Sequence, residues 1–231
     1  MTERHVIIVN YNTPELTEAA IKSVNKHTKG CTFHLLDNSD QRPFTAEMPN
    51  VEYVDNTHGQ LVDFATWPER FPNRIPSPKN NYGSAKHTYS IQLMLDRIET
   101  DCVLLDSDIL LKRDISDLWD SRYLFSAEVK TNTRSWGYSI FRAKPIVCYV
   151  NVPLMRRHRI SYFNEAKMWD LQATRPENIY DTGAWFFEEC ESMHLPWRRI
   201  SIGDYAEHFG HGSWKGQDAT DWLNQHSNLW K

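Results

Sequence analysis

Two carboxylates close together at the end of an apolar run are the first candidates for chemistry in this sequence. Asp106 and Asp108 are one residue apart in "LLDSDILL", residues 104–111. A carboxylate is costly to remove from water unless something positive compensates it, so the pair needs solvent, a basic partner or a metal ion. Later in the chain, "HFGHGSW" places His208 and His211 in a Gly-rich turn. Histidines of this kind are metal-ligand candidates, but a lone histidine is more often a structural group.

The composition of the 231 residues, 40% hydrophobic and 24% charged, is typical of a globular protein. This length suits one domain, 1–231. A formal net charge of -4 gives no electrostatic support for nucleic-acid binding, which normally needs a basic excess. The sequence does contain one short basic cluster, which we predict to be a solvated turn: Arg156, Arg157, His158 and Arg159.

The sequence contains no apolar run long enough for a signal-peptide core or a membrane span, since the opening "MTERHVIIVN" reaches only four apolar residues in a row. We therefore expect no integral membrane segment. Cys31, Cys102, Cys148 and Cys190 are scattered and form no CxxC pair, which favours reduced thiols. We expect a cytoplasmic protein, and the sequence leaves open a peripheral position at the membrane surface.

Strand and helix patterns alternate along the first half of the chain. Continuous apolar runs predict buried strands, and apolar residues at helical spacing predict helices. The strands are expected over 5–12, 31–40, 50–56 and 101–108, and the helices over 15–28 and 84–99. This order predicts an α/β fold with a mainly parallel, twisted sheet and helices on both faces.

The second half of the chain has a less regular pattern. It predicts paired strands over 123–129 and 135–142, a helix over 183–194, a strand running into a turn over 198–214, and a closing helix over 217–231. Trp222, Leu229 and Trp230 are expected to supply apolar contacts of the closing helix. The Pro-rich stretch 65–81 is longer than a typical connection, and is either a lid over the site or a surface insertion.

Unusual polar residues follow several of the predicted strands. Asn10, Tyr11 and Asn12 follow the first strand, Asp37 the second, and Asp106 with Asp108 the fourth. Ligands of parallel sheets bind beyond the carboxyl ends of the strands. We therefore expect these side chains to share one edge of the sheet.

Four stretches in this order resemble an A-type-fold (GT-A) glycosyltransferase, closest to glycosyltransferase family 2. They are "VIIVNYNTPELTEAAIKSV", "HLLDNSD", "NNYGSAKH" and "VLLDSD", which together span most of the first 110 residues. They are similar to the family's opening strand, turn and helix, its second strand with an acidic residue, its Asn-x-Gly segment and its Asp-x-Asp (DXD) motif. The resemblance implies the nucleotide-diphospho-sugar transferase fold, with a nucleotide-sugar-binding half at about 1–110 and an acceptor-binding half at about 111–231.

The resemblance also implies a metal-dependent reaction. A divalent cation held by carboxylates neutralises the charge that develops on a departing diphosphate. Asp108 is then a direct ligand, and Asp106 faces the ribose or a metal-bound water. "HFGHGSW" matches the position at which related transferases complete the metal shell, through His208 in preference to His211. We expect Mn²⁺ or Mg²⁺, and an imidazole ligand favours Mn²⁺.

The same resemblance assigns donor-binding residues. Asn10, Tyr11 and Asn12 line the base, with Tyr11 as a stacking face or as a plain core residue. Asp37 contacts the base or ribose, forms an Asx-turn, or does both. Gly83 allows close approach of the backbone to the nucleotide, Lys86 reaches a phosphate, and Ser107 lies within the Asp-x-Asp motif. We expect a UDP-sugar as the donor.

On the acceptor side, "IYDTGAWFFEE" occupies the position of the family's acidic motif. The familiar form of this motif is a Glu-Asp pair, whereas here Asp181 is followed by Thr182 and Gly183. An inverting transfer needs a base near the attacking hydroxyl, and Asp181 is the first candidate. Its alternative role is a helix N-cap. Glu188 or Glu189 is the second candidate for the base.

The leading functional prediction is an inverting, metal-dependent glycosyltransferase of polysaccharide biosynthesis. It would move a sugar to a glycan or a lipid-linked saccharide acceptor. A retaining transferase of the same fold is one alternative, which the late "HFGHGSW" turn favours. A non-catalytic sugar-nucleotide-binding protein is the other, because the Glu-Asp pair is absent.

Overall fold

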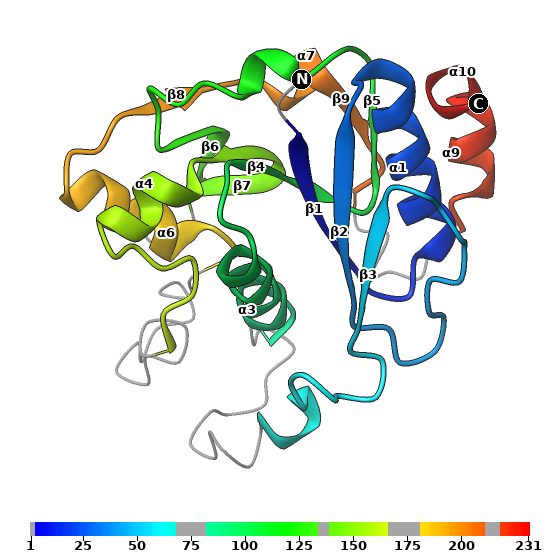
Figure 1. The fold of residues 1–231 in the computed structure, drawn as a ribbon, viewed down its shortest axis with the longest axis horizontal. Helices are drawn as coiled ribbons and strands as arrows, with labels where there is room; N and C mark the ends of the chain where they lie inside the picture. Colours follow the sequence, from blue (N-terminus) through cyan, green and yellow to red (C-terminus); the bar gives the residue numbers. More distant parts are fainter. Residues whose placement is uncertain (1–2, 68–81, 134–138, 166–180, 211–217) are drawn as a thin grey trace.

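A seven-stranded sheet with the strand order β3-β2-β1-β4-β7-β6-β8 forms the centre of the structure (Figure 1). The structure is a computed structural model, and it describes residues 3–67, 82–133, 139–165, 181–210 and 218–231. Strands β1 to β4 are parallel, β7 is antiparallel to β4 and to β6, and β8 is parallel to β6. The bounds are β1 Arg4–Asn10, β2 Cys31–Asp37, β3 Val51–Asp55, β4 Cys102–Asp106, β6 Phe125–Thr133, β7 Ser139–Val150 and β8 Trp197–Arg199.

Helices cover both faces of this sheet, because the buried strands present apolar side chains alternately to either side. In β1, Val6 and Ile8 pack on the side of helices α1 and α7, while Ile7 and Val9 pack on the side of α3, α4 and α6. The predicted α/β class is confirmed. The helix bounds are α1 Pro14–His27, α3 Tyr82–Arg97, α4 Val152–Arg157, α6 Ala184–Ser192 and α7 Ile202–Tyr205.

A second, two-stranded sheet pairs β5, Ile109–Leu111, with β9, Ala206–His208, in antiparallel register. All three residues of β5 are fully buried, and Leu110 packs against α1 and the C-terminal helices. This small sheet joins two segments about a hundred residues apart in the sequence. It begins one residue after the predicted Asp-x-Asp motif.

Two parts of the second half differ from the sequence prediction. The segment 198–214 is not one strand and a turn, because α7 separates β8 from β9. The closing helix is divided into α9, Thr220–Gln225, and α10, Ser227–Trp230, where the His226 ring contacts the Trp222 carbonyl at 2.8 Å. The predicted apolar contacts of Trp222, Leu229 and Trp230 are confirmed. None of the described helices is long and apolar enough to cross a membrane.

The predicted solvated turn is confirmed in part: Arg156, Arg157 and Arg159 are exposed and residues 158–159 form a turn, but Arg156 also contacts α3. Arg156 lies on α4, and its Nη2 donates to the carbonyls of Leu95, Asp96 and Ile98 at 3.2, 3.1 and 2.7 Å. These carbonyls lie at the C-terminal end of α3, where the last turn of a helix leaves acceptors without partners inside the helix. Arg156 therefore fixes the end of the helix that carries several site residues. Arg157 is exposed.

We expect Arg156→Met to destabilise the fold by about 1–2 kcal/mol, because charge-assisted bonds to the α3 carbonyls are lost. Arg157→Met serves as the matched control and should change the free energy of unfolding by less than about 0.5 kcal/mol. Chemical denaturation of both variants measures the difference. Equal effects would show that the Arg156 contacts contribute nothing to stability.

Candidate active site

The end of β4 holds the two carboxylates of the predicted Asp-x-Asp motif. β4 is buried from Cys102 to Leu105, and the side chains of Asp106 and Asp108 are only 21% and 12% exposed. Burial raises the pKa of Asp106, and the charge of Asp108 adds to this, while nearby cationic side chains oppose it. Two carboxylates held close together with little water therefore need positive charge near them.

His208 reaches these carboxylates through the small second sheet. Ile109 pairs with His208 in the β5–β9 ladder, and Phe209 N donates to Asp108 O at 2.9 Å. His208 Nε2 then lies 3.2 Å from Asp108 Oδ1. Burial by itself lowers the pKa of His208, but the hydrogen bond and charge of Asp108 outweigh it and raise the pKa. The pairing of two short strands thus brings together Asp108 and His208, which lie a hundred residues apart in the sequence.

Asp106, Asp108 and His208 fit the requirements of a divalent cation. Each offers one ligand atom, and these atoms all lie within 4.8 Å of one another. Asp106 Oδ1 is buried and accepts no hydrogen bond within the described part of the chain. Two carboxylate oxygens and one imidazole nitrogen are donors that Mn²⁺ accepts readily. The second histidine of the prediction, His211, lies outside the described residues.

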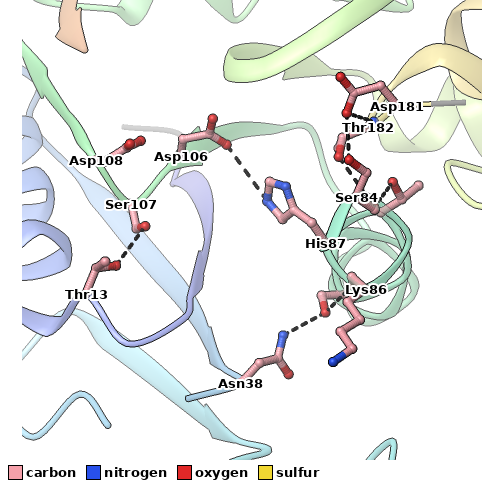
Figure 2. A network of polar contacts seen from close by, with 12 residues as sticks. Thr13, Asn38, Ser84, Lys86, His87, Asp106, Ser107, Asp108, Asp181 and Thr182 are labelled. Atoms are coloured by element: carbon pink, nitrogen blue, oxygen red, sulfur yellow. Dashed lines mark hydrogen bonds and ion pairs between the residues drawn. The ribbon is translucent and has the colours of Figure 1, made fainter. Parts of the chain in front are cut away.

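His87 is a site residue that sequence reasoning missed. Its Nε2 lies 3.8 Å from Asp106 Oδ1, and Figure 2 shows its ring directed at that carboxylate from α3. The predicted phosphate ligand, Lys86, points away from Asp106 in the same view, with its Nζ 5.7 Å from the centre of the Phe64 ring. Adjacent helix residues point in different directions, so only one of the two can face the carboxylates. The predicted contact of Lys86 with a phosphate stays a prediction.

Asn10 is a structural residue at the end of β1. It is completely buried, and its Nδ2 donates to Asp37 Oδ1 and to Ser39 Oγ, both at 2.9 Å. Its Oδ1 accepts from the hydroxyls of Thr13 and Thr17 at 3.2 and 2.8 Å. Asn10 therefore joins the ends of β1 and β2 to the start of α1. Its predicted contact with the donor base stays a prediction.

Asp37 is also buried and bound by protein donors. Oδ1 accepts from Asn10 and from Ser39 N at 3.0 Å, and Oδ2 from Phe44 N at 2.6 Å and the Tyr53 hydroxyl at 3.0 Å. The bond to Ser39 N is the predicted Asx-turn, which is confirmed. Since a carboxylate has about four acceptor positions, these bonds occupy it. A direct contact between Asp37 and the nucleotide stays a prediction.

The turn after β1 presents the other predicted donor-binding residues. Tyr11 is 39% exposed, so the alternative of a plain core residue is wrong. Its hydroxyl donates to Asp40 Oδ2 at 3.2 Å, and Asn12 Nδ2 donates to Asp40 Oδ1 at 2.6 Å. Ser107 is buried, with its Oγ 3.2 Å from the hydroxyl of Thr13 (Figure 2). Tyr11 therefore presents an exposed aromatic ring in the turn that follows β1.

Asp181 lies beside the first turn of α3, next to Ser84 (Figure 2). Its Oδ1 accepts from Ser84 Oγ at 2.7 Å and from Thr182 N at 2.8 Å, and its Oδ2 forms an ion pair with Arg142 of β7. The alternative of a helix cap is wrong, since α6 has Gly183 as its N-cap residue and no side-chain cap. Figure 2 shows Ser84 and His87 on one turn of α3, directed at Asp181 and Asp106 respectively.

Gly183, two residues after Asp181, has a backbone conformation that requires glycine. Its φ is +81°, and a Cβ at this position would lie 1.9 Å from the carbonyl oxygen of Ala143 on β7. Only glycine allows this approach of the backbone to β7, which places Asp181 beside Arg142. The second candidate for the base, Glu189, is half-buried, and its Oε2 accepts from Ser161 N at 3.1 Å. Glu188 is exposed.

Comparison with solved structures identifies the fold. The galactosyltransferase LgtC, in complex with donor and acceptor sugar analogs, is similar with a TM-score of 0.54 and 13% identity, over 85% of this chain and 73% of LgtC. The apo-form glycosyltransferase GlyE of Streptococcus pneumoniae TIGR4 has a TM-score of 0.50 and 15% identity, over 99% of this chain and 51% of GlyE. The bifunctional WbbM has a TM-score of 0.50 and 13% identity, over 87% of this chain and 39% of WbbM.

This protein has the A-type glycosyltransferase fold. The predicted fold class is therefore confirmed by the neighbours as well as by the sheet. No protein-family model matches the sequence, and no curated protein matches it. The closer resemblance to family 2 and the division into a donor and an acceptor half stay predictions. The candidate metal group draws on both predicted halves, since it combines Asp106 and Asp108 with His208.

We expect Gly183→Ala to be strongly destabilising and to displace Asp181, because both φ and the Ala143 carbonyl exclude a side chain there. Gly83→Ala is the matched control: no atom lies within 4 Å of a Cβ there, and alanine is favoured in a helix by up to about 1 kcal/mol. Thermal unfolding compares the two. Equal melting temperatures for wild type and Gly183→Ala would contradict the account of Gly183. Separately, a stable Gly83→Ala variant that loses donor binding would support close approach of the nucleotide at Gly83.

Proposed function

We propose that the protein is a metal-dependent glycosyltransferase that moves a sugar from a nucleotide-diphosphate sugar, a UDP-sugar first, to a glycan or lipid-linked acceptor. The observation that carries the proposal is the group formed by Asp106, Asp108 and His208 at the carboxyl end of β4. The group lies in a fold similar to those of LgtC and GlyE. Membership of family 2 and a function in polysaccharide biosynthesis belong to this proposal.

The chemistry assigned to the site follows from its residues. Asp106, Asp108 and His208 would hold Mn²⁺ or Mg²⁺, and the imidazole favours Mn²⁺. Such a cation, when bound, stabilises negative charge on a diphosphate leaving group. His87 adds a further nitrogen beside Asp106, and Tyr11 offers an exposed ring to a nucleobase.

For the stereochemical course we propose inversion, with Asp181 as the base. Ser84, Thr182 and Arg142 fix its carboxylate, and one of about four acceptor positions remains for a sugar hydroxyl. A base held in a fixed orientation within hydrogen-bond reach of the hydroxyl contributes roughly 10²–10⁴-fold to rate. The retaining alternative needs no such base, and Asp181 would then serve only as the partner of Arg142.

We expect Asp108→Ala and His208→Ala to lose the stabilisation that Mn²⁺ with a UDP-sugar gives the wild type. Mutation of residues that only support a metal ligand typically lowers metal affinity by roughly 10- to 100-fold. Removal of a direct ligand should lower the affinity for Mn²⁺ by at least as much. Glu207→Gln is the control, since Glu207 is next to His208 but pairs with Lys112 at 3.1 Å. Thermal shift and sugar transfer are measured together. Full metal-dependent transfer by Asp108→Ala would exclude the proposed site.

A separate test addresses Asp181. We expect Asp181→Asn to keep the donor-dependent thermal shift while transfer falls by about 10²–10⁴-fold, and the wild-type product to have the inverted anomeric configuration. NMR of the product gives the configuration directly. A retained configuration would reject Asp181 as an inverting base, and donor binding without transfer to any acceptor would indicate the non-catalytic alternative.

A further inference from the structure

The turn between β4 and β5 carries both carboxylates of the metal group and is anchored on two sides. β4 ends at Asp106 and β5 begins at Ile109, so Ser107 and Asp108 make the whole connection. On one side, Phe209 N donates to the Asp108 carbonyl at 2.9 Å. On the other, the buried Ser107 places its Oγ 3.2 Å from Thr13 Oγ1 (Figure 2). The middle residue of the motif is therefore joined to a residue 94 positions earlier in the chain.

Thr13 departs from the usual role of its position. It is the N-cap residue of α1, where a threonine hydroxyl normally accepts a hydrogen bond from the backbone of the first helical turn. Within the described first turn of α1, its side chain forms no such bond. The buried hydroxyl instead contacts Asn10 Oδ1 at 3.2 Å and Ser107 Oγ. Departures from a local rule of this kind are expected where a residue serves a functional site.

The direction of each hydrogen bond in this network follows from Asp37. An ionised carboxylate accepts hydrogen bonds and cannot donate them, so the Asn10 amide presents Nδ2 to Asp37 at 2.9 Å. Asn10 Oδ1 then faces Thr13 and accepts from its hydroxyl. Because this bond uses the single proton of the Thr13 hydroxyl, the contact with Ser107 has Ser107 as its donor. Ser107, Thr13 and Asn10 thus each donate to the next member, and Asp37 ends the chain.

Burial makes this network rigid. Asn10 is completely buried, and Thr13 and Ser107 are buried as well. A broken bond in such a place would leave a buried polar group without a partner, so the hydroxyls keep their geometry. Ser107 is therefore held in one position between Asp106 and Asp108. A divalent cation needs its ligand oxygens at fixed distances, and groups behind the ligands supply that order.

We propose that Thr13 is a positioning residue of the metal group: its hydroxyl fixes Ser107, and Ser107 sets the relative placement of Asp106 and Asp108. The inference rests on the proposed function, because it assigns Thr13 a role toward the cation that this group would bind. Thr13 acts through Ser107 and not as a ligand. Its contribution is to arrange the carboxylates before the cation arrives, so that less ordering is needed on binding.

The test is calorimetric titration of the full chain with Mn²⁺ alone. We expect Thr13→Val to lower the affinity for Mn²⁺ by roughly 10- to 100-fold, as is typical when a group that supports a metal ligand is changed. Valine keeps the branched shape of the side chain and lacks the hydroxyl. Thr13→Ser restores the hydroxyl and should return the affinity close to that of the wild type.

Thr17→Val is the matched control. Thr17 is completely buried, and its hydroxyl donates to the same atom, Asn10 Oδ1, at 2.8 Å, whereas the contact with Ser107 comes from Thr13. Both valine variants should lower the melting temperature in EDTA, because each leaves Asn10 with one donor fewer. Only Thr13→Val should weaken Mn²⁺ binding. This difference separates positioning of the metal group from a general effect on stability.

Ser107→Ala removes the same bond from its other partner, and keeps the test valid if Thr13→Val does not fold. Its effect on Mn²⁺ affinity should equal that of Thr13→Val. The double variant should lose no more affinity than either single variant, because all three lack the same interaction.

A folded Thr13→Val variant with wild-type Mn²⁺ affinity would overturn the inference, and so would equal weakening by Thr13→Val and Thr17→Val. In both cases the wild type still binds Mn²⁺ and Asp108→Ala does not, so the proposed function stands. Failure of the proposed function differs from this. It would appear as no Mn²⁺ binding by the wild type and no response to any nucleotide sugar, and it would remove the inference as well.

Discussion

Two carboxylates at the end of a buried strand have to be balanced by positive charge, and the surrounding structure meets this constraint from several directions. Asp106 Oδ1 is buried without a hydrogen-bond donor among the described residues. The β5–β9 ladder brings His208 to Asp108, and helix α3 brings His87 to Asp106. The site therefore depends on strand pairing and on one helix turn more than on any local motif. A divalent cation would complete the balance.

The strand ends were predictable from sequence, because apolar runs that stop at polar residues mark buried strands in a parallel sheet. Asp106 and Asp108 followed from that pattern, and His208 from its turn and the family resemblance. His87 and Arg142 were not found, since neither belongs to a recognisable motif: His87 lies in a helix whose predicted ligand was its neighbour, Lys86. Arg142 was assigned only to a strand. Its ion pair with Asp181 depends on the packing of β7 against the turn before α6, which no local pattern encodes.

Residues suited to nucleotide binding are also suited to turns, and this limits what sequence can say of the donor side. Asn10 and Asp37 were predicted as donor contacts, yet in the structure both are buried and hold the ends of β1 and β2 together. Asn12 and Asp40 organise the next turn and leave Tyr11 exposed. On the acceptor side, a backbone requirement two residues after Asp181 helps to position this carboxylate. Gly183 permits the contact with β7 that pairs Asp181 with Arg142.

The central claim is that Asp106, Asp108 and His208 form one divalent-cation site. A crystal of the full chain soaked in Mn²⁺, with diffraction recorded at the manganese absorption edge, tests it most directly. The account predicts an anomalous peak within bonding distance of all three side chains, which disappears in His208→Ala or becomes weaker. A strong peak elsewhere, or none at this position at saturating Mn²⁺, would contradict it.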